Sequence, residues 1–395
     1  MLKVEKRLVA FLEKNILLLF VLFCTLLGMV IRISLRNIIS GDYTIYLQPW
    51  YEEIKSKGLS EQVGNYNLLY QFIIWILTKT PLPSLFAYKI VSCIFDWFLA
   101  IITGAVIYNI TEDNKKIKAM IGYCLVWMSP IVCLNSAAWA QCDSIYVTFG
   151  VLSILLLDKD MEFWAFVALG ASFAFKLQAV FVVPLFLLAY VIKKRFSILN
   201  FFIIPIVMIL TALPTILLGH RSIAEVFSVY LDQTGYYQMM VLRYPSIWLL
   251  LCQSDNPVQY ANLKIFAILI AVFVLATFMV MWIKNKYPMN GRALYMIAFI
   301  LVYTCVLFLP AMHERYGYMV EILAIVLAIL EIRTMPLCIG LICLSLNTYG
   351  RGLFEITTNW QVLAVINLAI YILYVTYIFK SMQNFKSENI SNKEV

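Results

Sequence analysis

Isolated polar residues interrupt an otherwise apolar chain, and their types suit chemistry on a charged substrate. Asp42 is a carboxylate a few residues beyond the first apolar segment, whereas Lys176 and Arg315 are cations far along the chain. A cation holds a phosphate and stabilises the charge that develops on it as it leaves, and a carboxylate removes a proton from an attacking hydroxyl. One acid with several separated cations therefore indicates transfer chemistry on a phosphate-linked substrate.

Asp42 is the candidate catalytic residue. It follows the first apolar segment closely, and Gly41 allows the backbone a tight bend beside it. The alternative is that Asp42 only caps a loop helix that starts at Tyr43. The residues that we expect to bind substrate are Tyr43, Trp50, Trp139, Gln141, Asp143, Lys176, Gln178, Arg243, His313, Glu314, Arg315 and Tyr316.

Several other kinds of site are not expected. The sequence has no Gly-rich phosphate loop, which argues against a nucleotide site. Its 2 histidines, His220 and His313, are far apart, and its 9 cysteines include no Cys-x-x-Cys pair. We therefore expect no metal site, no disulfide framework and no cofactor.

The composition places the chain in a membrane. Apolar residues make up 63% of the 395 residues and charged residues only 13%, whereas soluble chains are nearer half and a quarter. A membrane span needs roughly 20 apolar residues, so the chain has material for about twelve spans. This excludes a soluble enzyme, a nucleic-acid-binding module and a disordered chain, and it predicts one all-α polytopic membrane domain over 1–380 with membrane lipids around it. The net charge of +8 then reflects topology and not a nucleic-acid partner.

Clusters of lysine and arginine predict the orientation, because they collect on the cytoplasmic side. Such clusters precede the first apolar segment, recur at 115–118, 193–195 and 284–292, and occupy the tail. If all are cytoplasmic, an even number of spans separates successive clusters and both termini are cytoplasmic. The predicted spans are 16–34, 83–109, 119–134, 143–157, 163–176, 178–192, 197–218, 259–283, 293–310, 314–331, 336–348 and 360–380.

Some segments do not fit this map simply. If 66–79 were a span, the basic cluster at 115–118 would lie on the extracytoplasmic side. We therefore expect 66–79 to be a short membrane-embedded or interfacial helix. It would lie inside a large first extracytoplasmic loop at 35–82. The segments around Lys176 and at 336–347 are short for full spans. Irregular helices are tolerated where they border a protein-lined cavity, which favours a site. Residues 381–395 have the composition of a disordered cytoplasmic tail.

Polar residues at membrane depth also have structural explanations. A lysine at the position of Lys176 has two equally good explanations: its side chain extends to the membrane interface, or it belongs to a functional site. Asp96 is better explained as a partner inside the bundle, and Glu321 also as a residue that pairs there. The polar residues at 313–316, between Pro310 and a further apolar segment, are harder to explain as packing and favour function.

Four motifs resemble those of polytopic glycosyltransferases of the GT-C superfamily. The chain most resembles the bacterial mannosyltransferase-like proteins related to the second mannosyltransferase of GPI-anchor synthesis. It is more distantly similar to the dolichyl-phosphate-glucose glucosyltransferases of the N-glycan pathway. The motifs are SGDYTIYLQPW (Ser40–Trp50), SPIVCLNSAAWAQCDS (Ser129–Ser144), FKLQAVFVVP (Phe175–Pro184) and MHERY (Met312–Tyr316).

This resemblance implies an inverting enzyme at the outer face of a bacterial plasma membrane. Its donor would be an undecaprenyl-phosphate-linked hexose, and its acceptor a cell-surface glycan or lipid-linked saccharide. Asp42 matches the position of the family's catalytic acidic residue, and Lys176, His313 and Arg315 match its phosphate-side contacts. RYPSIW (Arg243–Trp248) departs from relatives, which commonly carry an Asn-rich stretch, so the resemblance does not extend to the sugar or the acceptor.

Two other classes of function remain open. A transporter or flippase for a lipid-linked sugar would show repeat symmetry between halves and discontinuous helices in matching positions. The chain instead concentrates its polar groups in one outer loop and at several outer span ends, which favours an enzyme. A non-catalytic membrane subunit of a wall-synthesis complex would not need Asp42 together with the His-Glu-Arg-Tyr motif.

Overall fold

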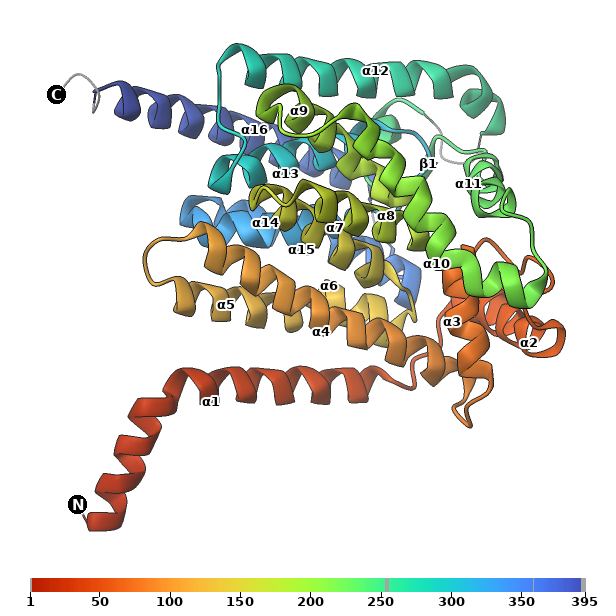
Figure 1. Ribbon diagram of the computed structural model, residues 1–395, viewed down its shortest axis with the longest axis horizontal. Coiled ribbons are helices and arrows are strands. Elements are labelled where there is room, and N and C mark those ends of the chain that lie inside the picture. Colours follow the sequence, from red (N-terminus) through yellow and green to blue (C-terminus); the bar gives the residue numbers. More distant parts are fainter. Residues whose placement is uncertain (1, 253–255, 358, 392–395) are drawn as a thin grey trace.

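The computed structural model describes residues 2–252, 256–357 and 359–391, and it consists almost entirely of helices packed side by side (Figure 1). Apolar segments fold this way because a helix satisfies its own backbone hydrogen bonds, which lipid cannot do. The chain is therefore an all-α protein, as its composition predicts.

Helices make up nearly all of the regular elements. In chain order, the helices are α1 (Lys3–Leu35), α2 (Gln48–Lys57), α3 (Leu68–Thr78), α4 (Ser84–Ile110), α5 (Lys115–Trp127), α6 (Pro130–Cys133), α7 (Asp143–Asp158), α8 (Glu162–Phe175), α9 (Val183–Lys193), α10 (Ile203–Gly219), α11 (Glu225–Tyr236), α12 (Pro257–Lys284), α13 (Gly291–Phe308), α14 (Tyr318–Leu330), α15 (Met335–Phe354) and α16 (Trp360–Ser391). The strands are β1 (Val241–Leu242) and β2 (Met312–His313).

The helices that could cross a membrane agree with the predicted spans in position. Each of the twelve predicted spans overlaps a helix. Within the described residues, 7 helices are long and apolar enough to cross, or 8 if α5 and the segment Pro130–Ala138 form one span bent by 42°. The remaining predicted spans correspond to shorter helices, such as α8 and α14. The chain is a multi-pass membrane protein.

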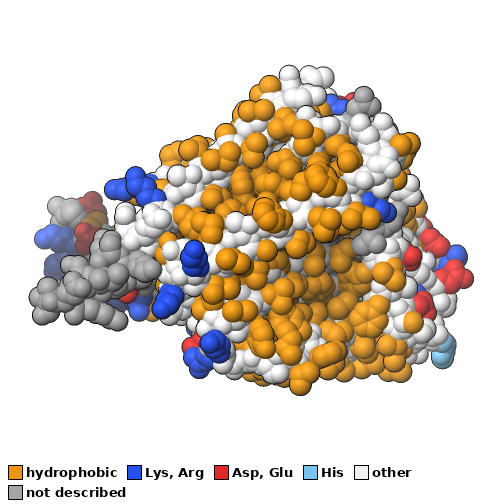
Figure 2. All heavy atoms as spheres, turned by 90° about the horizontal axis from the view of Figure 1, so that it is seen from above, with side chains coloured by type: hydrophobic (Ala, Val, Ile, Leu, Met, Phe, Trp, Pro, Cys, Tyr) orange, Lys and Arg blue, Asp and Glu red, His pale blue; other side chains and the backbone are white. Residues whose placement is uncertain are grey.

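The two ends of the bundle differ in charge. Both termini lie at one end, and α2, α3 and α11 lie at the other (Figure 1). The surface between the ends is broadly apolar, as a lipid-facing surface must be (Figure 2). Lysine and arginine gather toward the end with the termini, whereas a group of acidic side chains lies at the opposite end (Figure 2). We call the end with α2 and α3 the loop end.

The interior of the bundle is formed by α13 and α14. Every residue from Ala293 to Leu307 is buried, and so is every residue from Tyr318 to Ala328. A helix that is apolar and buried on all sides belongs to the core of a bundle. The connection between these two helices contains the His-Glu-Arg-Tyr motif, so the motif is attached at both ends to deeply buried helices.

Two segments that the span prediction set apart are helical. The apolar stretch at 66–79 contains α3, a short helix that packs against α10 and α8 at the loop end. The predicted tail at 381–395 begins inside α16, which continues to Ser391, so the structure has no boundary at 381. Residues 392–395 lie outside the described residues.

A buried ion pair attaches α1 to the bundle. The Arg32 guanidinium donates to Asp96 Oδ2 through Nε at 3.0 Å and through Nη2 at 2.9 Å, and its Nη1 donates to the carbonyl oxygens of Gly28 and Trp127. Ser136 Oγ also donates to Asp96, at 2.5 Å. Asp96 is thus a structural partner inside the bundle, as its sequence context favours. Its ion pair fixes the helix that precedes Asp42.

Candidate functional site

Asp42 is held by one of its two carboxylate oxygens. Oδ2 accepts hydrogen bonds from Trp139 Nε1 at 3.0 Å and from Gln141 Nε2 at 2.9 Å. The other oxygen, Oδ1, has no hydrogen-bond partner among the described residues, and the Asp42 side chain is 34% exposed. The carboxylate is therefore fixed in orientation while one oxygen stays open to a substrate hydroxyl.

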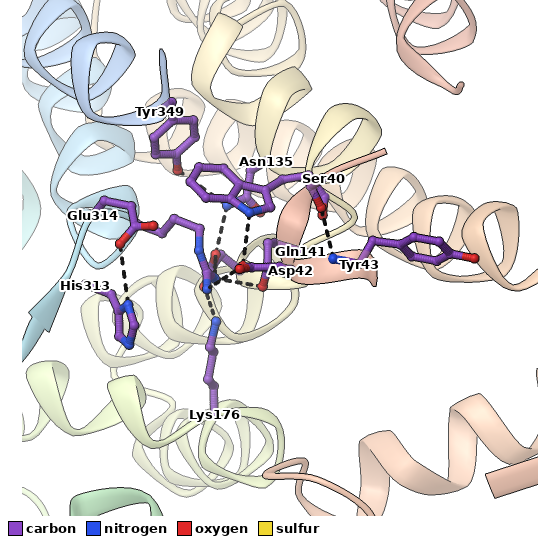
Figure 3. A network of polar contacts seen from close by, with 12 residues as sticks. Ser40, Asp42, Tyr43, Asn135, Gln141, Lys176, His313, Glu314 and Tyr349 are labelled. Carbon is purple, nitrogen blue, oxygen red and sulfur yellow. Dashed lines mark hydrogen bonds and ion pairs between the residues drawn. The ribbon is translucent and has the colours of Figure 1, made fainter. Parts of the chain in front are cut away.

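The backbone beside Asp42 argues against a capping role. A single π-helical turn begins at Tyr43, and the Asp42 side chain makes no hydrogen bond that caps it. Ser40 Oγ accepts from the Tyr43 amide at 3.2 Å instead (Figure 3). The alternative that Asp42 serves only as a helix cap is therefore wrong, because Ser40 supplies the cap.

The groups that hold Asp42 come from a distorted stretch of backbone. A π-helical turn at Leu134–Ala138 precedes Trp139, and Ala140 has a left-handed φ of 61°. Left-handed backbone at a residue other than glycine is strained, and such strain collects at functional sites. Single π-helical turns are also frequent there. The distortion presents Trp139 and Gln141, on either side of Ala140, to the same oxygen of Asp42.

A second carboxylate, Asp143, lies at the start of α7 and is buried. Asp143 Oδ1 pairs with Lys176 Nζ, and Oδ2 accepts from Asn135 Nδ2 at 2.8 Å and from Arg315 Nη1 at 3.1 Å. The Asp143 side chain is only 1% exposed. Both oxygens of Asp143 are thus engaged, in contrast to Asp42.

Lys176 lies where a helix is interrupted. α8 ends at Phe175, Lys176 has extended backbone, and a 3₁₀ turn at Leu177–Val182 leads into α9. The apolar segments on either side of Lys176 are short for full spans, and they predict this interruption of the helix. It turns the lysine side chain inward to Asp143 instead of letting it snorkel to the surface.

Arg315 connects the two carboxylates. Its Nη1 donates to Gln141 Oε1 at 2.7 Å as well as to Asp143, and its Nη2 lies 3.7 Å from Asp42 Oδ2. Its guanidinium carbon lies 5.4 Å from the centroid of the Trp139 ring, a distance that allows a cation–π interaction. Arg315 Nε is buried and has no partner in the part of the chain that the structure describes. Arg315 therefore takes part in the network and still has one N–H group, at Nε, that can donate a hydrogen bond.

Backbone pairing fixes the His-Glu-Arg-Tyr motif in place. β2 pairs in parallel with β1, so that His313 lies opposite Leu242. Ala311, just before β2, has a left-handed φ of 59°, and its amide donates to the Met240 carbonyl oxygen at 2.9 Å. A strained turn and a strand from a distant segment thus hold the residues that precede Arg315.

His313, Glu314 and Tyr237 form a second layer around Arg315. His313 Nδ1 lies 3.4 Å from Glu314 Oε2 (Figure 3), and the Tyr237 ring packs edge-on against the imidazole at 4.6 Å between centroids. Burial and the neighbouring Tyr46 raise the pKa of Tyr237 to about 12, so its hydroxyl remains a hydrogen-bond donor at physiological pH.

The remaining predicted residues differ in how close they lie. The Tyr316 ring lies 5.2 Å from the His313 ring between centroids, whereas Gln178 is buried and its Oε1 has no partner among the described residues. The Tyr43 side chain is buried and points away from Asp42, with its hydroxyl 2.7 Å from Ser84 Oγ (Figure 3). Trp50 packs on Tyr46 and Tyr66, and no hydrogen bond of the described residues joins it to the network.

Arg243 is an exposed residue beside the site. Its backbone forms a bridge with His313 and has a left-handed φ of 66°. No side-chain partner of Arg243 occurs among the described residues. The backbone of Arg243 therefore helps to position His313.

Three participants are not among the residues that the sequence predicts for the site. Asn135 Nδ2 donates to Asp143 and lies 3.3 Å from the Tyr349 hydroxyl, and the Tyr349 ring packs on Trp139 at 5.1 Å. An asparagine inside an apolar run is a signal that the sequence does contain. Tyr349 and Tyr237 carry no such signal, because tyrosine is common at membrane interfaces.

The network combines two carboxylates and two cations. Asp42, Asp143, Lys176 and Arg315 come from four separate segments and balance in formal charge. Both cations pair with Asp143, and cations of this kind can hold an anion. Among the described residues, no three His, Cys, Asp or Glu side chains are grouped as ligands for a metal ion.

Comparisons with known proteins do not extend this description. No family model and no curated protein sequence matches the chain. The resemblance to GT-C glycosyltransferases therefore depends on the four motifs alone, and function must be argued from the site.

Proposed function

We propose that the chain is a GT-C-type inverting glycosyltransferase that moves a hexose from an undecaprenyl-phosphate donor to a glycan or lipid-linked saccharide. The proposal includes twelve membrane spans, with some of the shorter helices lining the site. The observation that supports it most is the half-engaged carboxylate of Asp42, with Oδ2 fixed by Trp139 and Gln141 and Oδ1 unpartnered among the described residues. A general base needs an oriented oxygen within reach of the proton that it removes.

The proposed reaction is a single displacement. An acceptor hydroxyl oxygen attacks the anomeric carbon on the face opposite the phosphate, and its proton passes to Asp42 Oδ1. The new glycosidic C–O bond forms as the bond between the anomeric carbon and the phosphate oxygen breaks. The bonding electrons leave with that oxygen as polyprenyl phosphate, and the anomeric configuration inverts.

The two cations suit this transfer of charge. During the reaction one negative charge disappears from Asp42 and one appears on the departing phosphate. Arg315 lies within 3.7 Å of Asp42 and also contacts Asp143, whose other oxygen pairs with Lys176. A preformed pair of cations beside the leaving group stabilises the developing charge without reorganisation during the step.

A transporter for a lipid-linked sugar is the second candidate. The break between α8 and α9 at Lys176 and the break at Pro130 are discontinuous helices, which transporters also use. A transporter, however, has no need of a carboxylate with one anchored and one free oxygen. Asp42 therefore favours the enzyme.

A donor panel tests the proposal. Purified chain would be incubated with synthetic undecaprenyl-phosphate hexoses and a mixed saccharide acceptor, and free undecaprenyl phosphate would be measured. Release that depends on the acceptor is expected from at least one donor. Movement of intact donor across vesicles without release from any donor would support the transporter.

The orientation is a separate proposal, with the loop end outside and both termini in the cytoplasm of a bacterial cell. The gathering of basic residues at the end with the termini supports it. Ser56 and Ser197 are both exposed and lie at opposite ends of the bundle on this assignment. An impermeant thiol reagent should label Ser56→Cys in intact cells and not Ser197→Cys, and the reverse pattern would invert the orientation.

A further inference from the structure

Asp143 is the carboxylate of the network that a substrate cannot reach. Its side chain is 1% exposed, and its two oxygens are shared among Lys176, Arg315 and Asn135. A general base must offer an oxygen to the proton that it removes. Asp143 therefore lacks the free oxygen that a reserve base or a substrate contact would need.

The two cations that Asp143 holds are more accessible than Asp143 itself. The side chains of Lys176 and Arg315 are 19% and 11% exposed. They come from different elements, since Lys176 follows α8 and Arg315 precedes α14. Asp143 is the common point at which they meet, with one cation on each oxygen.

Lys176 depends on this anchor more than Arg315 does. A lysine ammonium is a point charge on a flexible stem with four carbons, whereas a guanidinium is a rigid fork. Lys176 has Asp143 as its hydrogen-bond partner and otherwise lies 5.8 Å from the Tyr146 ring. Arg315 is also held by Gln141. Without Asp143, Lys176 loses its hydrogen-bond partner and two like charges are left side by side.

We propose that Asp143 is a positioning residue that holds Lys176 and Arg315 together as one phosphate-binding pair, an inference that rests on the proposed function. Asp143 alone neutralises only one of the two cationic charges that it holds, so the pair can still attract an anion. Arg315 Nε, buried and unpartnered among the described residues, is a further donor of the same guanidinium. The chemical class that fits is a phosphate monoester or diester on a lipid chain.

A double-mutant cycle tests this proposal by binding, independently of turnover. The probe is citronellyl phosphate, a short polyprenyl monophosphate, titrated into the purified full chain in detergent micelles. Asp143→Asn should weaken binding roughly tenfold to a hundredfold, as expected for loss of a charge-assisted contact, and Lys176→Met should do the same. If Asp143 acts by holding the two cations, the two effects should not multiply: the double variant should bind only slightly more weakly than Lys176→Met alone, because Gln141 still holds Arg315.

The same experiment separates failure of this inference from failure of the proposed function. If the wild-type chain does not bind the probe, the proposed function fails and this inference fails with it. If the wild type binds and Asp143→Asn binds equally well, or the two effects multiply in the double variant, only the positioning role is overturned. The double variant keeps the number of charges balanced, so it serves as the readout if Asp143→Asn alone does not fold. Asp113→Asn, in an exposed ion pair with Lys118, is the control and should bind like the wild type.

Discussion

Arg32 and Arg315 each pair with an aspartate beside a tryptophan ring, and the pairs Arg32–Asp96 and Arg315–Asp42 differ in burial and in how fully the arginine is hydrogen-bonded. The Arg32 guanidinium lies 3.7 Å above the Trp127 ring and donates from all three of its nitrogens, although Asp96 Oδ1 is buried without a partner among the described residues. Arg315 lies 5.4 Å from its tryptophan ring, 3.7 Å from Asp42, and keeps one buried nitrogen without a described partner. The first pair is buried at both side chains, whereas Asp42 is partly exposed.

This difference separates a structural contact from a site. A buried pair with short contacts and additional hydrogen bonds offsets its desolvation cost and locks helices together. An ion pair with a longer N–O distance, a partly exposed carboxylate and an unpartnered donor contributes little to stability. Such an arrangement is retained where a ligand supplies the missing contacts. We therefore interpret the Arg32–Asp96 pair as a contact that stabilises the fold. We interpret Arg315 and Asp42 as residues that take part in the proposed reaction.

The largest expected effect is on turnover by Asp42→Asn. An amide keeps the shape and most of the contacts of the side chain but cannot accept the proton, so transfer should fall by about 10²–10⁴-fold. The measurement is sugar transfer per folded molecule, with binding of citronellyl phosphate as a check on the site. Glu52→Gln, an exposed carboxylate on α2, is the matched control and should be fully active.

The corresponding change in the structural pair should act on stability instead. Asp96→Asn leaves the Arg32 charge buried without its counterion, which costs about 3–5 kcal/mol. Thermal unfolding in detergent should therefore occur at a clearly lower temperature, while molecules that remain folded transfer sugar normally. An Asp96→Asn protein with unchanged stability and lost turnover would reverse the assignment of the two pairs.

A more conservative change should distinguish an arginine of the site from one on the surface. Arg315→Lys keeps the charge but loses the planar fork that reaches Gln141, Asp143 and Asp42. Loss of a charge-assisted contact reduces transfer by roughly tenfold to a hundredfold. Arg333→Lys, at an exposed position, should have no effect. Equal activity of both variants would move Arg315 to the structural group.

The smallest effect is expected where only the orientation of Asp42 changes. Trp139→Phe removes one of the two donors to Asp42 Oδ2 and keeps most of the ring packing. Loss of one such hydrogen bond lowers transfer by roughly threefold to tenfold. Trp97→Phe, an exposed ring on α4, provides the comparison. A loss as large as that of Asp42→Asn would mean that Trp139 itself contacts substrate.

The all-α character of the chain and the positions of its apolar helices could be predicted from the sequence because they follow from composition. A run of about 20 apolar residues has few alternatives to a helix, and helices overlap all the predicted spans. The interruption at Lys176 could also be predicted, since the apolar segments on either side are short. Helix ends are less predictable. The helix through 381 continues because cooperative helices extend into polar sequence.

The site could be predicted only in part. Asp42, Gln141, Asp143, Lys176 and Arg315 stand out because charged or amide groups at membrane depth are expensive. Tyr43 and Trp50 are expected from their nearness to Asp42 in sequence, but the π-helical turn directs Tyr43 away. Which residues meet depends on left-handed backbone at Ala140 and Ala311, and alanine carries no sequence signal for that conformation.

Chemical rescue of Asp42→Ala by formate tests the central claim most directly. The alanine variant removes the carboxylate from a partly exposed position, so a small carboxylate from solution has room to take its place. The account predicts that the variant is nearly inactive, that formate restores transfer in proportion to its concentration, and that neither the wild type nor Arg315→Ala responds. An Asp42→Ala protein that transfers sugar at the wild-type rate without formate would contradict the claim that Asp42 is the general base.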